Sequence, residues 1–154
     1  MSEEITIVEL PERLAVVVEG RAPADGLSVA LAECIPAAVG AVVEAGLEIQ
    51  SPPFTRYLEV GEEFHIECGV LVEYEPSGEL AGNAEVRRLG ATRAVRAVHR
   101  GHYDTLRATY EAIEMWMAGQ GLTGSEPPLE IYLNDPGEVA PDEIETEILQ
   151  PVRP

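Results

Sequence analysis

Short runs of alternating apolar and polar residues dominate the chain, and two longer amphipathic segments interrupt them. Alternation is typical of strands, and every second residue from Phe64 to Val72 is apolar. In the second amphipathic segment, apolar residues recur at steps of three and four from Tyr103 to Met117, as on one face of a helix. Strands are predicted near 5–10, 13–20, 55–60, 64–72, 85–89, 92–99, 129–134 and 144–150, and helices near 25–45 and 103–119.

The order of these elements repeats. Arg-x-x-x-Asp-x-Leu begins at Arg21 and again 79 positions later at Arg100. After the helices the offset is 75, as for the Tyr-Leu pairs that begin at Tyr57 and Tyr132. A change of four residues is about one helical turn, which a duplicated helix can lose without rotating its apolar face. The sequence therefore predicts an internal duplication.

Each copy is predicted to have the element order strand, strand, helix, strand, strand. The copies span about 1–74 and 84–154, and the turn-rich segment EPSGELAGN joins them within a single predicted domain, 1–154. Grouped strands with short turns favour an α+β fold in which an antiparallel sheet carries helices on one face. A concave surface where two such copies meet is a usual place for a ligand cleft.

Charge narrows the range of partners. The net charge is −18, and all ten basic residues are Arg. Such a chain is repelled by nucleic acid and by anionic membranes, and it attracts cations. The start MSEEITIVEL is acidic, and no apolar run is expected to reach membrane length. Cys34 and Cys68 form no CxxC motif, so we expect buried, reduced thiols and a cytoplasmic location.

The candidate chemistry lies in the predicted strand LEIYLN. Leu129, Ile131 and Leu133 point to one face, and Glu130 and Tyr132 point to the other. Alternation alone leaves two possibilities open. The acidic face is solvated, or it lines a cavity in which the glutamate meets a partner.

Two segments resemble a known family. HRGHYDTLRATYEAIEMWMAGQGL, followed by PPLEIYLNDPGEVAPDEIETEILQPV, is similar to the second half of the GyrI-like small-molecule-binding domain. FHIECGVLV resembles the end of its first half. The resemblance implies two modules related by a pseudo-two-fold axis. It also implies a cleft in which a glutamate and aromatic walls bind cationic or amphipathic ligands.

Carried over by position, the resemblance makes Glu130 the cleft glutamate, with Tyr132 beside it. Trp116 is a second candidate wall, although a tryptophan at the edge of an apolar stripe fits the core equally well. Tyr57 is the repeat partner of Tyr132, while Thr55 stands where the second copy has Glu130. The remaining ligand-binding candidate is Glu67, an acidic position of the family type.

The sequence offers few other candidates for catalytic or metal-binding residues. His65 and Glu67 share a strand face and are interpreted either as an acid–base pair or, more commonly, as a surface contact. His99 and His102 lack a third ligand, so no metal is expected. No cofactor is expected either, because nucleotide-binding fingerprints are absent from the sequence. The arginines of the second half predict intramolecular ion pairs or, as the alternative, a docking patch: Arg87, Arg88, Arg93 and Arg96.

Three functions remain open. The first is a stand-alone protein that takes cationic or lipophilic small molecules into a central cleft at Glu130. The second, implied by the hydrolase branch of the family, is an enzyme that opens a strained, cyclopropane-bearing ring with Glu130 as acid or base. The third is an acidic protein-interaction module of the gyrase-inhibitor type. With no room predicted for a helix-turn-helix, direct DNA binding is not expected, and a separate protein partner is a further option.

Overall fold

A computed structural model describes residues 4–153, and its contacts divide the chain into two units. One unit comprises Glu12–Gly90. The other combines the described residues up to Pro11 with those from Ala91 onward. Each unit is an antiparallel sheet that packs against one long helix.

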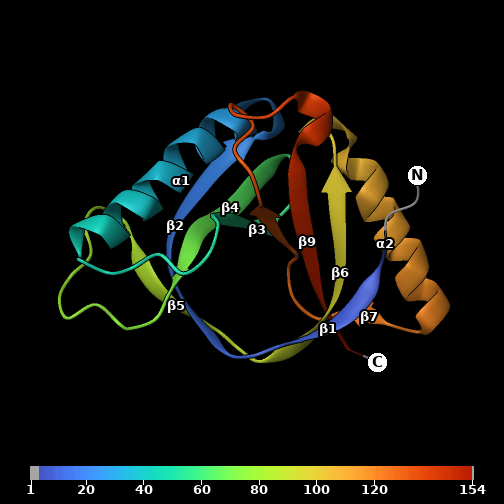
Figure 1. Ribbon diagram of the computed structural model, residues 1–154, viewed down its shortest axis with the longest axis horizontal. Helices are drawn as coiled ribbons and strands as arrows, with labels where there is room; N and C mark the ends of the chain where they lie inside the picture. Colours follow the sequence, from blue (N-terminus) through green and yellow to red (C-terminus); the bar gives the residue numbers. More distant parts are fainter. Residues whose placement is uncertain (1–3, 154) are drawn as a thin grey trace. The chain divides into compact units, whose positions relative to one another are not determined.

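In the unit formed by Glu12–Gly90, the sheet order is β3-β4-β2-β5. The helix α1 covers the sheet face that carries Val16, Ile66 and Cys68, because its buried side chains pack among these residues. Figure 1 shows α1 lying along β2. The bounds are β2 Arg13–Pro23, a 3₁₀ turn η1 Ala24–Gly26, α1 Leu27–Glu44, β3 Phe54–Glu59, β4 Glu63–Val72 and β5 Glu85–Leu89.

In the other unit, the sheet order is β1-β6-β9-β8, and the short strand β7 also pairs with β9. Ile113 and Met117 of the helix α2 pack on Val95, Ala97 and Ile148 of the sheet. Figure 1 shows α2 lying beside β6. The bounds are β1 Thr6–Leu10, β6 Thr92–Arg100, η2 Tyr103–Thr105, α2 Leu106–Gln120, β7 Thr123–Gly124, β8 Leu129–Tyr132, η3 Pro141–Glu143 and β9 Glu145–Arg153.

The predicted α+β class and the duplication are confirmed. Strand β2 with α1, β3 and β4 corresponds to β6 with α2, β8 and β9. The first strand of each copy is exchanged, however. β1 pairs with β6 of the second copy, from Thr6 opposite Arg96 to Leu10 opposite Thr92. In turn, β5 of the second copy pairs with β2 of the first. Each unit therefore contains one strand from the other copy.

The expectation that no apolar run approaches membrane length is wrong for one segment. Ala24–Glu44 is long and apolar enough to cross a membrane by length and composition, with a mean hydropathy of 1.9. One such helix is weak evidence for a membrane span, because a core helix of a soluble protein passes the same test. In this fold, Cys34, Ala38, Ala41 and Val42 of α1 are buried against the sheet.

Both cysteines are core residues, as expected. Cys34 on α1 and Cys68 on β4 are free and buried in the same cluster. Burial raises the pKa of Cys68 to about 12 and also raises that of Cys34. Because the thiolate is the reactive form, neither thiol is poised as a nucleophile near neutral pH.

Candidate functional site

Glu130 lies on the helix-covered face of its sheet. In the register of β8 with β9, Glu130 stands opposite Ile148, and Ile148 packs in the core cluster beneath α2. Because alternate residues share a face, Tyr132 lies on the same side as Glu130. The carboxylate-bearing residue is only 5% exposed. The sequence did not decide whether the strand face of Glu130 and Tyr132 is solvated or buried, and the structure shows that Glu130 is buried there.

Two tyrosine hydroxyls donate hydrogen bonds to the Glu130 carboxylate. The Tyr110 hydroxyl on α2 lies 2.6 Å from Oε2, and the Tyr132 hydroxyl lies 3.2 Å from Oε1. Hydrogen bonds to an ionised acceptor are stronger than neutral ones. Both of these donors are neutral phenols, so they stabilise the carboxylate by hydrogen bonding.

A third tyrosine extends this aromatic surround. The ring of Tyr103 in η2 meets the ring of Tyr132 edge to face, with centroids 6.0 Å apart and planes at 78°. Burial raises the pKa of the Tyr103 phenol, and the negative charges of Glu130 and Asp135 raise it further. We call Glu130, Tyr103, Tyr110 and Tyr132 the acid–tyrosine cluster.

The raised pKa of Tyr103 makes stability depend on alkaline pH. Because the folded chain holds the phenolic proton more tightly than the unfolded chain, the contribution is complete below the unfolded pKa of about 10 and is lost as the pH rises above it. We expect the free energy of unfolding of the wild type to fall more steeply between about pH 9 and pH 11 than that of Tyr103→Phe. Urea denaturation at several pH values measures this slope.

Tyr74→Phe is the matched control, because Tyr74 is largely exposed. Its slope should follow the wild type. Parallel slopes for wild type and Tyr103→Phe would contradict the prediction.

His99 fastens the start of α2 to the sheet. The residue is buried on β6, with Nδ1 2.7 Å from the Thr109 hydroxyl on α2 and Nε2 2.9 Å from the Thr105 hydroxyl. Because the Thr105 hydroxyl donates its hydrogen to the carbonyl oxygen of His102, its oxygen accepts a hydrogen bond from the Nε2–H of His99. Within residues 4–153, no three His, Cys, Asp or Glu side chains gather as metal ligands.

Trp116 and Tyr57 lie in apolar surroundings. Trp116 is partly buried on α2 and packs against the core cluster of its own unit. Tyr57 lies on β3 in the other unit, where its ring meets that of Phe64 edge to face at 6.3 Å. Their roles as ligand walls stay predictions, as does the expected cleft where the two copies meet.

Glu67 has a different environment from the one expected. It is 1% exposed, and Arg56 and Arg87 donate hydrogen bonds to its two oxygens at 2.9 and 2.8 Å. The interpretation of Glu67 and His65 as a surface contact is wrong, because His65 contacts Glu19 and Glu59 instead. Glu67 therefore forms buried ion pairs with Arg56 and Arg87 within the sheet.

The predicted ion pairs of the second-half arginines are confirmed. Arg87 contacts Glu19 and Glu85 in addition to Glu67, and Arg88 contacts Glu12 and Glu75. The other two arginines of that group also pair with acids: Arg93 with Glu9, and Arg96 with Glu147. These partners explain why basic residues gather there in an acidic chain.

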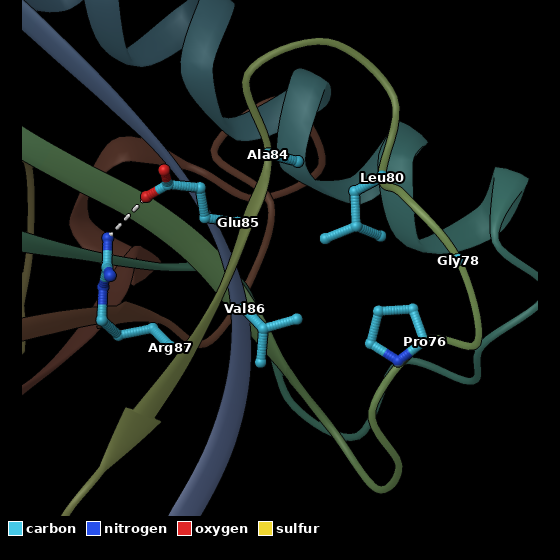
Figure 2. Close-up of a pocket in the computed structure, with 7 residues that line it drawn as sticks. All are labelled: Pro76, Gly78, Leu80, Ala84, Glu85, Val86 and Arg87. Atoms are coloured by element: carbon cyan, nitrogen blue, oxygen red, sulfur yellow. Dashed lines mark hydrogen bonds and ion pairs between the residues drawn. The ribbon is translucent and has the colours of Figure 1, made fainter.

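A hollow of about 440 Å³ lies on the connector and β5, and its lining includes no residue of the acid–tyrosine cluster. Figure 2 shows the side chains of Pro76, Leu80 and Val86 turned toward it, while Glu85 and Arg87 form an ion pair on the other side of the strand. Glu85 and Arg87 are also among the residues that line the hollow, and none of the predicted ligand-binding residues is. We therefore do not assign the ligand site to it.

Tyr110 and Tyr103 belong to the acid–tyrosine cluster, but the sequence pattern predicts them only as members of the apolar stripe of the helix. Seven positions separate them, so they belong to one helical face. A buried tyrosine hydroxyl usually finds a partner, and the acid in the following strand was the available signal.

The chain is similar to a known protein family and to several solved structures. A family model described as the GyrI-like small molecule binding domain matches residues 3–153. No curated protein matches the chain. Among solved structures, the C-terminal domain of EcmrR has 27% sequence identity and a TM-score of 0.85, over 99% of both chains. EcmrR in its complex with DNA has a TM-score of 0.82 at 27% identity, and the match spans 98% of this chain but 57% of that one.

Two more distant structures share the fold. SAV2435 bound to tetraphenylphosphonium has a TM-score of 0.71 at 13% identity, over 97% of this chain and 94% of that one. A hydrolase from Listeria innocua has a TM-score of 0.69 at 16% identity, over 97% and 92%. At such identities the likeness establishes the architecture alone.

Proposed function

Because the chain belongs to the GyrI-like small-molecule-binding domain family, we propose that it binds cationic, aromatic small molecules at the acid–tyrosine cluster. The observation that carries this proposal is the Glu130 carboxylate, 5% exposed and hydrogen-bonded by the hydroxyls of Tyr110 and Tyr132. A cytoplasmic location belongs to the same proposal, and the free, buried cysteines agree with it.

Electrostatics supports a cationic ligand. A carboxylate held away from water interacts strongly with a nearby positive charge, because the surroundings screen the attraction poorly. The chain's net charge of −18 adds a long-range field that draws cations toward it. The acid therefore favours a positive ligand over a neutral one of similar shape.

The tyrosines support an aromatic or lipophilic ligand. A cation over an aromatic face gains about 0.5–2 kcal/mol, and ring edges and faces also pack well against flat ligands. Charge and apolar shape discriminate less sharply than a fixed hydrogen-bond pattern does. Binding of several related cations is the expected behaviour. The structural relative SAV2435, solved with tetraphenylphosphonium, supports the choice of probe.

Isothermal titration calorimetry with tetraphenylphosphonium measures the binding affinity and tests the proposal. Triphenylphosphine oxide is the neutral aromatic control. We expect the cation to bind at least about tenfold more tightly than the neutral compound, in proportion to the lost charge and cation–π attraction. Equal affinities, or no binding of the cation, would refute the proposal.

DNA binding is not part of the proposal. EcmrR forms a DNA complex, but this chain spans 57% of that protein. The excess of acidic residues opposes contact with a phosphate backbone.

A further inference from the structure

Thr146 on β9 is fully buried, yet its hydroxyl lacks a hydrogen-bond partner. Thr146 is 0% exposed, and its buried Oγ1 makes no hydrogen bond to any of residues 4–153. Buried polar groups are nearly always paired, so an exception calls for an explanation. Valine has almost the same shape and would remove the unpaired oxygen.

The position of this hydroxyl connects it to the acid–tyrosine cluster. Thr146 stands opposite Tyr132 in the β8–β9 pair, while Glu130 stands opposite Ile148, two residues along β9. Thr146 and Glu130 are thus diagonal neighbours on one face, with Cα atoms about 7–8 Å apart. On its other side Thr146 stands opposite His99 of β6.

The duplication shows that the hydroxyl is not required by the fold. Glu67 and Glu147 are equivalent in the two copies, so the residue before each is equivalent too. In the first copy that residue is Ile66, buried in an apolar cluster. The same comparison sets Thr55 against Glu130. Both positions are therefore more polar in the copy that holds the buried acid.

We propose that the Thr146 hydroxyl is a second anchoring group of the ligand site. The preferred ligand then carries a positive charge for Glu130 and a neutral hydrogen-bonding group about one aromatic ring away from that charge. This inference rests on the proposed function and narrows its ligand class. The Thr146 hydroxyl gains a hydrogen-bond partner only when the ligand is bound. Ligands that carry a hydrogen-bonding group at this point are therefore favoured. Entry of the ligand group moves the side chains that now cover Thr146.

Two matched phosphonium ions test this arrangement. Tetraphenylphosphonium has no hydrogen-bonding group, and (4-hydroxyphenyl)triphenylphosphonium adds one hydroxyl at the far side of a ring. The full chain is titrated with each as wild type and as Thr146→Val. We expect Thr146→Val to weaken binding of the hydroxyl-bearing ion about tenfold, the size of one hydrogen bond, and to leave tetraphenylphosphonium within about twofold.

Thermal unfolding without ligand supplies a second readout. Because Thr146→Val removes an unpaired buried hydroxyl and keeps its shape, the melting temperature should rise. Thr146→Ser, which keeps the hydroxyl, should retain the preference for the hydroxyl-bearing ion. Thr123→Val, at an exposed position of β7, is the matched control and should change neither affinity.

The outcomes separate this inference from the proposed function. If Thr146→Val weakens both ions equally, or neither, the second anchor is refuted while binding at Glu130 stands. A lower melting temperature of Thr146→Val would also refute it, because the hydroxyl would then be satisfied by an enclosed water. If neither ion binds the wild type, the proposed function and this inference both fail.

Discussion

Replacing Glu130 with glutamine is expected to weaken tetraphenylphosphonium binding at least about 100-fold, or about 3 kcal/mol. Glutamine keeps the size of the side chain and an oxygen that can accept a tyrosine hydrogen bond, but it carries no charge. The ligand's positive charge then enters a covered site without its counter-charge. Isothermal titration of wild type and Glu130→Gln at the same ionic strength measures the difference.

Glu114→Gln provides the control for this variant. Glu114 is exposed on α2, and its replacement changes the net charge by the same amount. Its affinity should stay within about twofold of the wild type, because exposed charges are screened by salt. An unchanged affinity in Glu130→Gln, or an equal loss in both variants, would reject Glu130 as the charge partner. A thermal unfolding curve shows that each variant is folded.

Arg56→Met is expected to lower the free energy of unfolding by about 3–5 kcal/mol, because it leaves the buried Glu67 without one of its two arginine partners. Both atoms of the Arg56 fork reach the same carboxylate oxygen, Nε at 2.9 Å and Nη2 at 2.8 Å. Methionine preserves the length of the side chain and its apolar packing. Urea denaturation measures the loss.

The same substitution at Arg93 separates burial from ion pairing. Arg93 pairs with Glu9 at 2.8 Å on the surface, so Arg93→Met should cost at most about 1 kcal/mol. In the double variant Arg56→Met with Glu67→Met, much of the lost stability should return, since the buried carboxylate is gone and Arg87 keeps its contacts with Glu19 and Glu85. If Arg56→Met and Arg93→Met cost the same, the Glu67 pair contributes no more than a surface contact.

Local patterns predicted the elements well but misplaced some ends. The second strand was expected to stop near residue 20, yet β2 continues to Pro23 because Ala22 and Pro23 pair with Phe64 and Glu63 of β4. The last strand was expected to end before Pro151, and β9 runs through it. The Pro151 carbonyl oxygen accepts a hydrogen bond from Ser125, a contact distant in sequence. Such pairings leave no local signal.

The site was predictable only in part for a similar reason. Alternation placed Glu130 and Tyr132 on one strand face but could not tell which face α2 covers. The β8–β9 register decides this, and it depends on residues nearly twenty positions away. Glu67 illustrates the converse case. Its strand position was visible, but the arginines that hold it come from β3 and β5.

The exchanged first strands constrain how the chain is made and how it arose. β1 leaves the ribosome well before its partner β6, because more than eighty residues separate the paired positions. Until then it is an unpaired edge, the kind of segment that promotes aggregation during slow, non-local folding. A single copy taken alone would lack the partner with which its first strand pairs here. Two copies of one module that exchange their first strands reproduce the pairings of β1 with β6 and of β5 with β2, which is the geometry of a strand-swapped dimer joined into one chain.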